Sequence, residues 1–591
     1  MATQLQQHTS TLKITIDDNP LDDAIASLLA YATIDDSRVQ PDLFTLSFRD
    51  QGREVIAGSA ARIGAVVKIS VIAEDTPAAG EDLITGEITA LETEYDGAGA
   101  LTVIRGYDHS HRLFRGRRTE TYVDVTYADV VRKVAARVNL EVGEVKPTRG
   151  VHQHVTQANA TDWQFLQRLA REVGYQLAVA DGKVRFCPPT EAETGPGDEA
   201  SLESTDPLQL VLGSNVLRLH AVVTAAHQVD QVEVRGWDVA AKRALVANAP
   251  ASTTSAAVGV TPDGLSGLFG GGVHVSADTP YGRQSDVDTA VSALADEVAS
   301  SFAELDGVAR GNPRLKAGAA VRLSLVGEPF DGRYTLSSTR HRYDPEDGYT
   351  TSFTVSGPRD RTLLGLVGSP SGASRASGSS GGSGGGLDRV AGVVSALVSD
   401  TGDPERLGRV KLHFPWLSGS YTTYWARVAQ PGAGNNRGGM MLPEVNDEVL
   451  VAFEHGDINR PYVIGGLYNG VDRPPLTDNL IDPTSGAVQH RGFASKNDHR
   501  LVFRDAPGDS QIFLGTGGER AESLSLDQTK REVRLRADTG VVEINGGREV
   551  TIRTDGNLTL EAAGKLTLRG GTVSVTGSGP TEVKGNPIKL N

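Results

Sequence analysis

The segment EVTIRTDGNLTLEAAGKLTLRGG, from Glu549 to Gly571, repeats a pair of apolar residues split by one polar residue. The pairs follow one another at an interval of eight and begin upstream of this segment: Val542 and Ile544, Val550 and Ile552, Leu558 and Leu560, Leu566 and Leu568. Strict alternation places the apolar side chains of each short strand on one face. No helical pattern nearby could cover that face. The sequence therefore predicts that the cover comes from outside the segment.

Three intertwined copies of the chain would provide this cover. A single chain coiled in eight-residue steps has a thin core and open strand edges. Three chains wound around one axis bring their apolar faces into a central column and hydrogen-bond each other's edges, with glycines at the corners. We expect about eight steps between residues 512 and 591, which at ~4.7 Å a step gives a rod of roughly 40 Å. An ordinary β-sandwich at the C-terminus is the alternative.

The predicted core of this trimeric needle consists of the alternating apolar residues of the repeat. They are Val542, Ile544, Val550, Ile552, Leu558, Leu560, Leu566, Leu568, Val573 and Val575.

Composition narrows the class of protein. The chain has 591 residues and a formal charge of −16 at pH 7, which argues against nucleic acid as a partner. No stretch reaches the roughly 18 apolar residues of a membrane span, and no secretory signal is visible, so we expect no stable membrane insertion. Cys187 is the only cysteine, which excludes an intrachain disulfide and fits a reducing compartment. Abundant glycine and few aromatics indicate many short strands and tight turns.

The segment SPSGASRASGSSGGSGGG, residues 369–386, is typical of a flexible linker. It divides the chain into parts of different character. We predict the following domains: a hub at 1–366, the Gly/Ser linker at 367–386, an OB-fold neck at 387–472, a connector at 473–499 and the needle at 500–591. The OB-fold rests on five strand patterns within about 85 residues, at 389–399, 406–414, 424–430, 448–454 and 461–468.

The hub is predicted to be α+β, with β-barrel modules and helices packed on or between them. Alternation predicts strands at 66–74 and 101–107. Helix patterns with start signals occur at four places. They are 21–32 after Asn19 and Pro20, the helix opened by Thr126 with Asp129, the helix opened by Thr161 with Gln164 and closed by Gly174, and residues 287–305.

Several long motifs resemble the VgrG spike proteins of contractile injection systems, which are relatives of the fused hub and needle of contractile phage tails. The most specific are GRVKLHFPWL at 408–417 and the run from YWARVAQ to GGLYNG at 424–470, with GNPIKLN at the end. Residues 84–135, 159–177 and 330–355 look like the hub region of that family. The resemblance covers nearly the whole chain.

The resemblance implies a homotrimer in which two related barrels per chain give the hub pseudo-sixfold symmetry. Such a hub meets the hexameric ring of an inner tube protein and the baseplate proteins. The OB-fold forms the neck and the rod is the piercing needle. A PAAR-type tip protein would dock on Ile588, Leu590 and Asn591. Effector cargo rides inside the tube or on the tip.

Two departures from the family pattern concern the type of machine. The Gly/Ser linker is not expected in typical type VI secretion spikes, and Glu444 stands where the family commonly has a basic residue after the proline of MMLP. Both favour a phage-tail-like extracellular system over type VI secretion. The spike would be made and assembled in the bacterial cytoplasm and then be released or fired with its particle.

Candidate chemistry is sparse. Two His-x-His pairs, His109/His111 and His152/His154, could each form half of a zinc site if both rings share a strand face, although surface or packing roles are the commoner outcome. Asp108, His111 and Arg112 lie in the hub motif, which favours packing. GAGNNRG at 432–438 lacks the following helix of a dinucleotide site and is expected to be a loop between barrel strands. We therefore predict no catalytic residue, no metal and no cofactor.

The predicted function is mechanical: a spike that joins baseplate and tube to a piercing tip and punctures a target envelope on sheath contraction. HExxH and GxxxxGK[ST] motifs are absent from the sequence, and we predict that the chain is not an enzyme. The basic residues of RGRR at 115–118 and of 309–318 are expected to form a solvated face or a tube contact. A hydrolase acting on cell-wall glycan and a receptor-binding tailspike are the alternatives.

Overall fold

The computed structural model describes residues 10–72, 80–96, 99–180, 182–197, 206–346, 348–357, 389–475, 480–517 and 522–589. The predicted Gly/Ser linker lies outside the described residues. The chain divides into two compact units, Met1–Asn469 and Gly470–Asn591. Among the described residues, no helix is long and apolar enough to cross a membrane.

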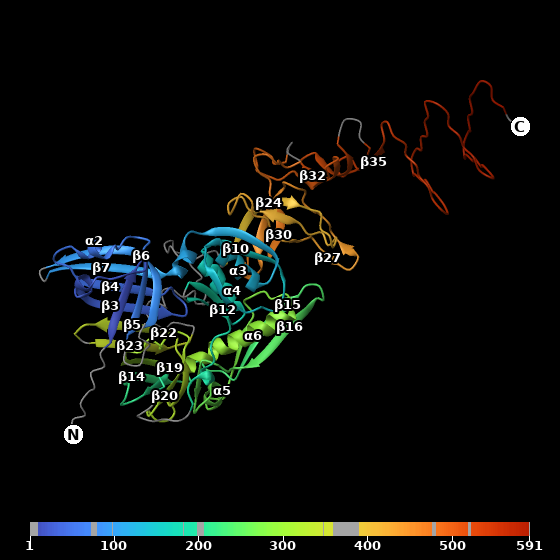
Figure 1. Ribbon diagram of the computed structural model, residues 1–591. Helices are drawn as coiled ribbons and strands as arrows, with labels where there is room; N and C mark the ends of the chain where they lie inside the picture. Colours follow the sequence, from blue (N-terminus) through green and yellow to red (C-terminus); the bar gives the residue numbers. More distant parts are fainter. Residues whose placement is uncertain are drawn as a thin grey trace. The chain divides into compact units, whose positions relative to one another are not determined.

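The first module of unit 1 is a set of antiparallel strands around one apolar core (Figure 1). Its large side chains, such as Phe44, Phe48 and Ile69, are fully buried because every second residue of each strand points inward. The predicted strands at 66–74 and 101–107 correspond to β5 and β7. The elements are β1 (Thr11–Ile16), β2 (Asn19–Pro20), α1 (Asp23–Ala26), β3 (Leu29–Ser37), β4 (Leu43–Arg49), α2 (Val55–Ser59), β5 (Val66–Ile72), β6 (Glu81–Asp96) and β7 (Gly99–Asp108).

The predicted helix at 21–32 is wrong. Helix α1 has four residues and is capped by Asp22, whose carboxylate accepts from the Ala24 N–H, while Asn19 and Pro20 pair with β1. Leu29, Ala32 and Ile34 belong to strand β3 and point into the core. Pairing of β3 with β4 on one side and β22 on the other outweighs the helical pattern of the short segment.

The second module packs two helices against short strands. Both predicted helix starts are confirmed, because Thr126 with Asp129 and Thr161 with Gln164 form complete capping boxes. Gly174 follows the second helix in the left-handed region, with φ 68°. The elements are η1 (His109–Phe114), β8 (Arg118–Val125), α3 (Tyr127–Arg137), β9 (Glu141–Val145), β10 (His152–Ala160), α4 (Asp162–Glu172), β11 (Gln176–Ala180) and β12 (Lys183–Cys187).

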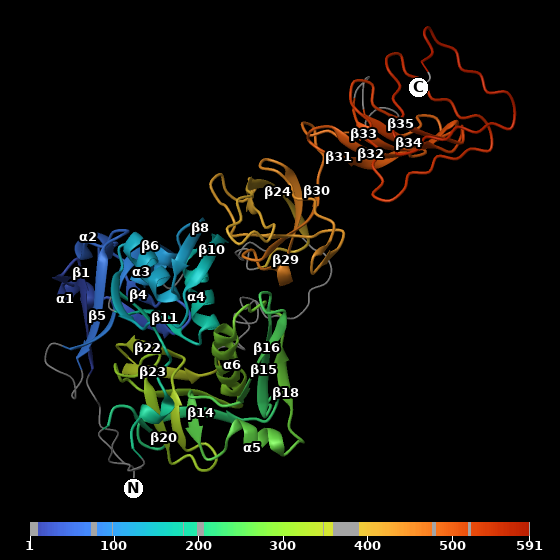
Figure 2. The ribbon, with the colours of Figure 1, turned by 90° about the vertical axis from the view of Figure 1, so that its right-hand side faces the viewer.

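The third module combines a second strand-rich core with a three-stranded sheet, β16-β15-β18, that is covered by one long helix (Figure 2). Its elements are η2 (Ala192–Thr194), β13 (Gln209–Val211), β14 (Val216–Val223), β15 (Gln231–Asp238), β16 (Arg243–Pro250), β17 (Ala256–Val258), α5 (Pro262–Gly267), β18 (Val273–Ser276), α6 (Gln284–Ala299), η3 (Ser300–Phe302), β19 (Ala303–Arg310), β20 (Ala320–Ser324), β21 (Gly332–Thr335), β22 (Ser338–Asp344) and β23 (Gly348–Val355).

Helix α6 is the helix predicted at 287–305, but it begins and ends earlier. Phe302 and Leu305 are buried as predicted, yet they lie in η3 and β19 and fill the neighbouring core. The first and third modules share one 11-stranded sheet, because β3 pairs with β22. That continuous sheet makes the two strand-rich cores one framework.

The OB domain is a small barrel whose five main strands are those expected from the sequence. They form the order β25-β24-β29-β30-β26, and mutual backbone hydrogen bonds between Val410 and Ala426 join the two ends. Phe414, Val449 and Val451 are fully buried inside. The elements are β24 (Val393–Asp400), β25 (Lys411–His413), β26 (Arg427–Val428), β27 (Ala433–Gly434), β28 (Arg437–Gly438), β29 (Glu448–Phe453), η4 (Glu454–Gly456) and β30 (Pro461–Gly466).

Unit 2 begins with an antiparallel meander of five strands in sequence order. They are β31 (His490–Ala494), β32 (His499–Ala506), β33 (Asp509–Thr516), β34 (Ser523–Asp527) and β35 (Glu532–Arg536). This corrects the expectation that the eight-residue steps start at 512. Tight turns, such as the one at Gly508 with φ 81°, fold residues 499–536 back on themselves, so that these strands pair within one chain.

The rest of the described chain, from 537 to 589, contains no strand (Figure 1). The apolar repeat lies here. Its backbone finds no ladder partner within its own chain among the described residues.

Candidate functional site

One face of the β31–β35 sheet carries two rows of apolar side chains, and the second row ends at Arg491 on the edge strand β31, opposite Phe503. In the first row Phe493 pairs with Leu501, and the row continues through Leu514 and Leu524 to Leu535. In the second row Phe503, Ile512, Leu526 and Val533 are cross-strand neighbours. We call these nine side chains the apolar ladder. Cross-strand neighbours of this kind pack together and form a continuous surface.

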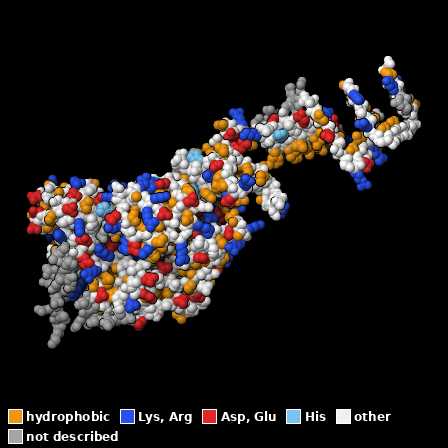
Figure 3. Space-filling model, turned by 45° about the vertical axis from the view of Figure 1, so that its right-hand side comes forward, with side chains coloured by type: hydrophobic (Ala, Val, Ile, Leu, Met, Phe, Trp, Pro, Cys, Tyr) orange, Lys and Arg blue, Asp and Glu red, His pale blue; other side chains and the backbone are white. Residues whose placement is uncertain are grey.

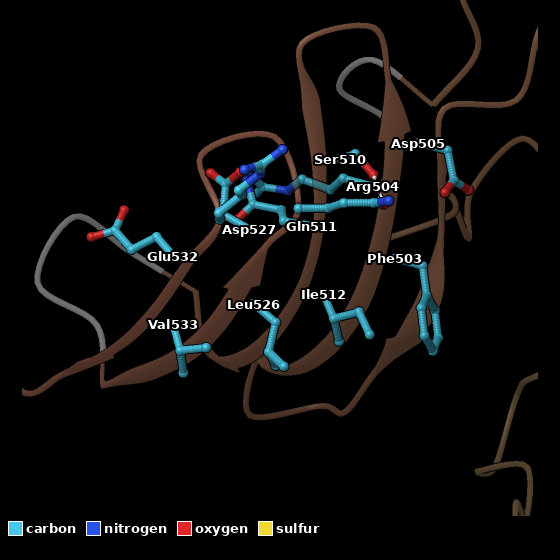
Figure 4. A pocket seen from close by; sticks show the side chains of 12 residues that line it. Phe503, Arg504, Asp505, Ser510, Gln511, Ile512, Leu526, Asp527, Glu532 and Val533 are labelled. Carbon is cyan, nitrogen blue, oxygen red and sulfur yellow. Dashed lines mark hydrogen bonds between the residues drawn. The ribbon is translucent and has the colours of Figure 1, made fainter. Parts of the chain in front are cut away.

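Eight of the nine side chains of the apolar ladder are exposed, and Leu501 is half-buried. Val533 is 72% exposed, Phe493 54% and Leu514 53%. Figure 3 shows hydrophobic side chains gathered on this part of the chain, and Figure 4 shows Phe503, Ile512, Leu526 and Val533 side by side, one on each of four strands. These four residues also line a pocket whose other residues are polar, among them Arg504, Gln511 and Asp527. A contiguous apolar surface of this kind marks an interaction site.

The other face of the same sheet is different in character. There Val502 is 3% exposed, and the Arg504 guanidinium lies 5.6 Å from the centre of the Phe513 ring. Ser525, Asp527 and Glu532 continue this face. Its apolar residues are thus largely covered, whereas the apolar ladder has no cover within the described chain.

The predicted needle core is also exposed in the single chain. Its ten residues range from 48% exposed for Val542 to 77% exposed for Val575. Burying such a side chain fully stabilises by about 1.5–3 kcal/mol, so leaving all of them in water is costly. The core assignment itself remains a prediction.

Of the three predicted tip-docking residues, Ile588 is 47% exposed. Leu590 and Asn591 lie outside the described residues. The tip site remains a prediction.

The hub motif residues Asp108, His111 and Arg112 lie where β7 ends. Asp108 is buried and accepts a hydrogen bond from the Ser110 hydroxyl at 2.5 Å. The His111 ring lies 2.7 Å from the Glu87 carboxylate on β6, and Arg112 binds the same carboxylate. Partial burial opposes ionisation of Glu87, but these hydrogen bonds outweigh it and lower its pKa to about 2. The contacts join β6 to η1, which is a packing role.

The two histidine pairs have different surroundings. His109 and His111 lie in the 3-10 turn η1, so this pair lacks the strand face that the zinc half-site would require. His152 and His154 lie on strand β10 at alternate positions. His152 stacks on Tyr127 with ring centres 4.1 Å apart, and His154 lies beside Tyr421 of the OB domain. Among the described residues, no group of three or more His, Cys, Asp or Glu side chains could hold a metal.

The glycine-rich GAGNNRG segment is a hairpin of the OB domain, as predicted. Strands β27 and β28 pair across it, and Asn436 has a left-handed φ of 55° at its turn. In the basic segments, Arg118 lies 3.9 Å from Asp162 and Arg314 lies 3.2 Å from Glu81. These arginines are paired within the chain, and a tube contact by them remains a prediction.

Sequence reasoning missed the apolar ladder as a surface. The signal was present, because Leu501/Phe503, Ile512/Leu514, Leu524/Leu526 and Val533/Leu535 are each an apolar pair split by one residue. The segments between them, such as APGD at 506–509, are turn formers. Read together, these features describe a hairpin meander with one apolar face.

The comparison with family models places a known domain in this chain. The model of the type VI secretion system/phage-baseplate injector OB domain matches residues 394–468. This confirms the predicted OB-fold. A second model, described as the Alg8 N-terminal domain, matches residues 78–344.

The chain is also similar in sequence to proteins that are named type VI secretion system spike proteins. The chain is 34% identical over 173 residues to the type VI secretion system spike protein VgrG4b of Pseudomonas aeruginosa, a match that covers 27% of this chain and 21% of that protein. It is 31% identical over 147 residues to the spike protein VgrG3 of Vibrio cholerae, covering 23% of this chain and 14% of that protein. This chain is related to the VgrG spike proteins.

A similarity of fold covers more of the chain than the sequence matches do. A chain of the Francisella PdpA-VgrG complex in its half-lidded form superposes with a TM-score of 0.50 at 9% identity, covering 90% of this chain and 88% of that one. This similarity concerns the fold alone. The sequence matches span less than a quarter of each VgrG relative, 21% of VgrG4b and 14% of VgrG3.

Proposed function

We propose that this chain is the spike of a contractile injection machine, a homotrimer that joins baseplate and inner tube to a piercing tip. The observation that carries the proposal is the C-terminal unit, which leaves both the apolar ladder and the repeat uncovered in one chain. The relatives that match part of the sequence are named spike proteins. A surface that needs further chains and a domain typical of spikes point to the same role.

In this proposal the repeat forms the needle. Its predicted core residues, from Val542 to Val575, meet their counterparts of two other copies around a threefold axis. Each backbone hydrogen bond between strands of neighbouring chains adds only about 1 kcal/mol net, but a chain pulled along the axis must break many of them together. The mechanism is therefore transmission of force, and it uses no catalytic residue and no cofactor.

The partners in this proposal follow the family pattern. The hub, with two strand-rich cores in one sheet, meets the tube ring and the baseplate proteins. A PAAR-type tip protein docks at Ile588, Leu590 and Asn591, and effectors travel with tube or tip. Assembly takes place in the bacterial cytoplasm, and the particle then acts outside it, in a phage-tail-like extracellular system.

The alternative functions have less support. A glycan-reading tailspike needs aromatic side chains presented for sugar stacking. The exposed rings of the C-terminal sheet, Phe493 and Phe503, stand within the rows of leucine, isoleucine and valine, so the apolar ladder accounts for them. A spike-associated hydrolase has no motif in its favour.

The mass of the purified full-length chain in solution tests the proposal. Light scattering at micromolar concentration is expected to give three times the chain mass of 62.4 kDa. A monomer would overturn the proposal. A dimer would do so as well, because two apolar faces alone leave a threefold column incomplete.

A further inference from the structure

The repeat by itself specifies its alignment between chains weakly. Val542/Ile544 and Val550/Ile552 are identical pairs eight residues apart, and so are Leu558/Leu560 and Leu566/Leu568. If one chain slips by eight residues along its neighbours, each apolar pair meets a pair of nearly equal volume and the polar residues stay outside. Strands with such patterns are prone to register slippage.

The apolar ladder differs between its two ends. Its first row reads Phe, Leu, Leu, Leu, Leu and its second Phe, Ile, Leu, Val from β31/β32 to β35. Both aromatic rings, Phe493 and Phe503, lie toward one side of the sheet, and Val533 and Leu535 lie on the last strand. A shifted copy would set large side chains against small ones and leave gaps, which cost free energy in a packed core.

Further copies of the same chain are the partner that best fits this face. The one charged side chain in its two rows is Arg491 on the edge strand β31, and the Asp505 carboxylate pairs with it at 2.7 Å within the same chain, so that the face is compatible with its own copy. Residue Arg536 ends β35, and the chain runs on directly into the exposed repeat. The chains that cover the repeat therefore lie next to the sheet and can cover it as well.

The edges of the sheet support the same occupant. Among the described strands, β31 pairs only with β32 and β35 only with β34, so that each outer strand keeps one open edge. Open edges invite strand pairing with another chain.

We infer that the apolar ladder of β31–β35 packs against the same face of two further copies and thereby fixes the register of the three chains in the repeat. This inference rests on the proposed spike function, since it assumes the trimer. In this arrangement the repeat supplies the length and stiffness of the needle, and the β31–β35 meander aligns the three chains. The pocket-lining residues Phe503, Ile512, Leu526 and Val533 are then interface residues rather than a ligand site.

The test is a distance measurement in the full-length chain. Cys187→Ser removes the only native cysteine, and Thr559→Cys places one spin label between Leu558 and Leu560, on the side expected to face solvent. Pulsed electron paramagnetic resonance then measures the label-to-label distance within the trimer. One narrow distance is expected for chains in register.

The deciding variant is Leu524→Asp with Leu526→Asp in this background. Both side chains are exposed in the single chain, at 36% and 44%, so the sheet of one chain should still form. The matched control is Ser525→Asp, which lies between them on the other face. We expect the double variant to give several distances or to dissociate at least tenfold more readily, while the control keeps the narrow distance.

Each result decides between the claims. If the double variant keeps both trimer mass and the single narrow distance, the inference is wrong while the spike proposal stands. If the unsubstituted ladder already gives several distances, the ladder does not set register. If the labelled parent is a monomer, the spike proposal itself fails. Leu524→Ala with Leu526→Ala, which keeps the face apolar but smaller, guards against misfolding and should broaden the distance less.

Discussion

Unit 1 and the C-terminal unit solve the problem of burial in opposite ways. In unit 1 the large apolar side chains of each module, such as Phe44, Phe165, Tyr334 and Phe414, are less than 2% exposed, and each core belongs to one chain. In the C-terminal unit nearly every large apolar side chain is 36% exposed or more, with Val502 a buried exception. Both units have regular apolar patterns. The difference shows that pattern alone does not say whose core a residue belongs to.

The contrast has a thermodynamic consequence. A core within one chain gives a stability that does not depend on protein concentration, whereas a core shared between chains gains stability with concentration by mass action. The two units should therefore respond differently to dilution and to substitution.

The largest effect is expected in the repeat. Leu560→Asp with Leu566→Asp would place charges of three chains in the predicted central column, where neither water nor a cation can compensate them. We expect the trimer to be lost at micromolar concentration, by at least a hundredfold weaker association, while the far-ultraviolet signal of the hub remains. Sedimentation velocity measures both the mass and its concentration dependence.

Thr559→Asp with Thr567→Asp is the matched control, because these threonines lie between the leucines and alternate to the other side. It should leave the trimer intact. Equal loss in both variants would contradict the assigned core, and equal retention would contradict the threefold column.

The second effect concerns the OB barrel. Phe414 is fully buried, and its ring centre lies 5.7 Å from that of Phe453 and 6.0 Å from that of Tyr421. Phe414→Ala should lower the free energy of unfolding of this domain by about 3–5 kcal/mol, from lost burial and the remaining cavity. Denaturant unfolding should show the same shift at low and high protein concentration. A shift that grows on dilution would mean that this core, too, is shared between chains.

The OB barrel was also the region where sequence reasoning worked best, for a physical reason. Its strands alternate apolar and polar residues and are separated by strong turn formers, so that local patterns locate each strand, although β24 pairs with the distant β29. The capping boxes at Thr126 and Thr161 are equally local, and both were predicted correctly. The segment at 21–32 failed because strands far away in sequence, including β22, pair with it and override its helical pattern.

The candidate site was only half predictable. The apolar repeat could be recognised as exposed without knowledge of the fold, because its strands are too short to cover themselves. The apolar ladder could not, since Leu501, Ile512 and Leu526 become neighbours only when the turns between them have formed. Which of its two faces stays uncovered depends on contacts that no single strand encodes.

The third effect is a pH dependence inside the hub. His341 is 2% exposed, and its ring lies 2.8 Å from the Tyr349 hydroxyl. Burial, together with the nearby Lys316 charge, lowers its pKa from 6.5 to about 3. Below pH ~6.5 His341 therefore binds a proton in the unfolded chain but not in the folded chain. The free energy of unfolding decreases as pH falls from about 6.5 toward 3. Above pH ~6.5 His341 is neutral in both the folded and the unfolded chain, so this loss of stability is absent.

His341→Gln removes this titration while keeping a polar side chain of similar size. Between pH 6 and 4 the parent should lose stability more steeply than the variant, by up to about 1.4 kcal/mol per pH unit. Urea unfolding monitored on the hub at several pH values measures the two slopes. Parallel slopes would show that His341 titrates normally and that the hub interior admits water at this point.

The smallest effect is local and tests how independent unit 1 is of assembly. The Thr161 hydroxyl accepts a hydrogen bond from the Gln164 N–H at the start of α4, and the Gln164 side-chain oxygen accepts one from the Thr161 N–H. Thr161→Ala removes the first bond and should cost about 1 kcal/mol of hub stability, whereas Thr161→Ser keeps the hydroxyl and should cost only a few tenths. Thermal unfolding of both variants at two concentrations measures the effect. Since α4 packs within one chain, the loss should be the same at either concentration, and the mass of the assembly should not change. A cap variant that also weakened the trimer would show that the hub, like the C-terminal unit, draws part of its stability from its neighbours.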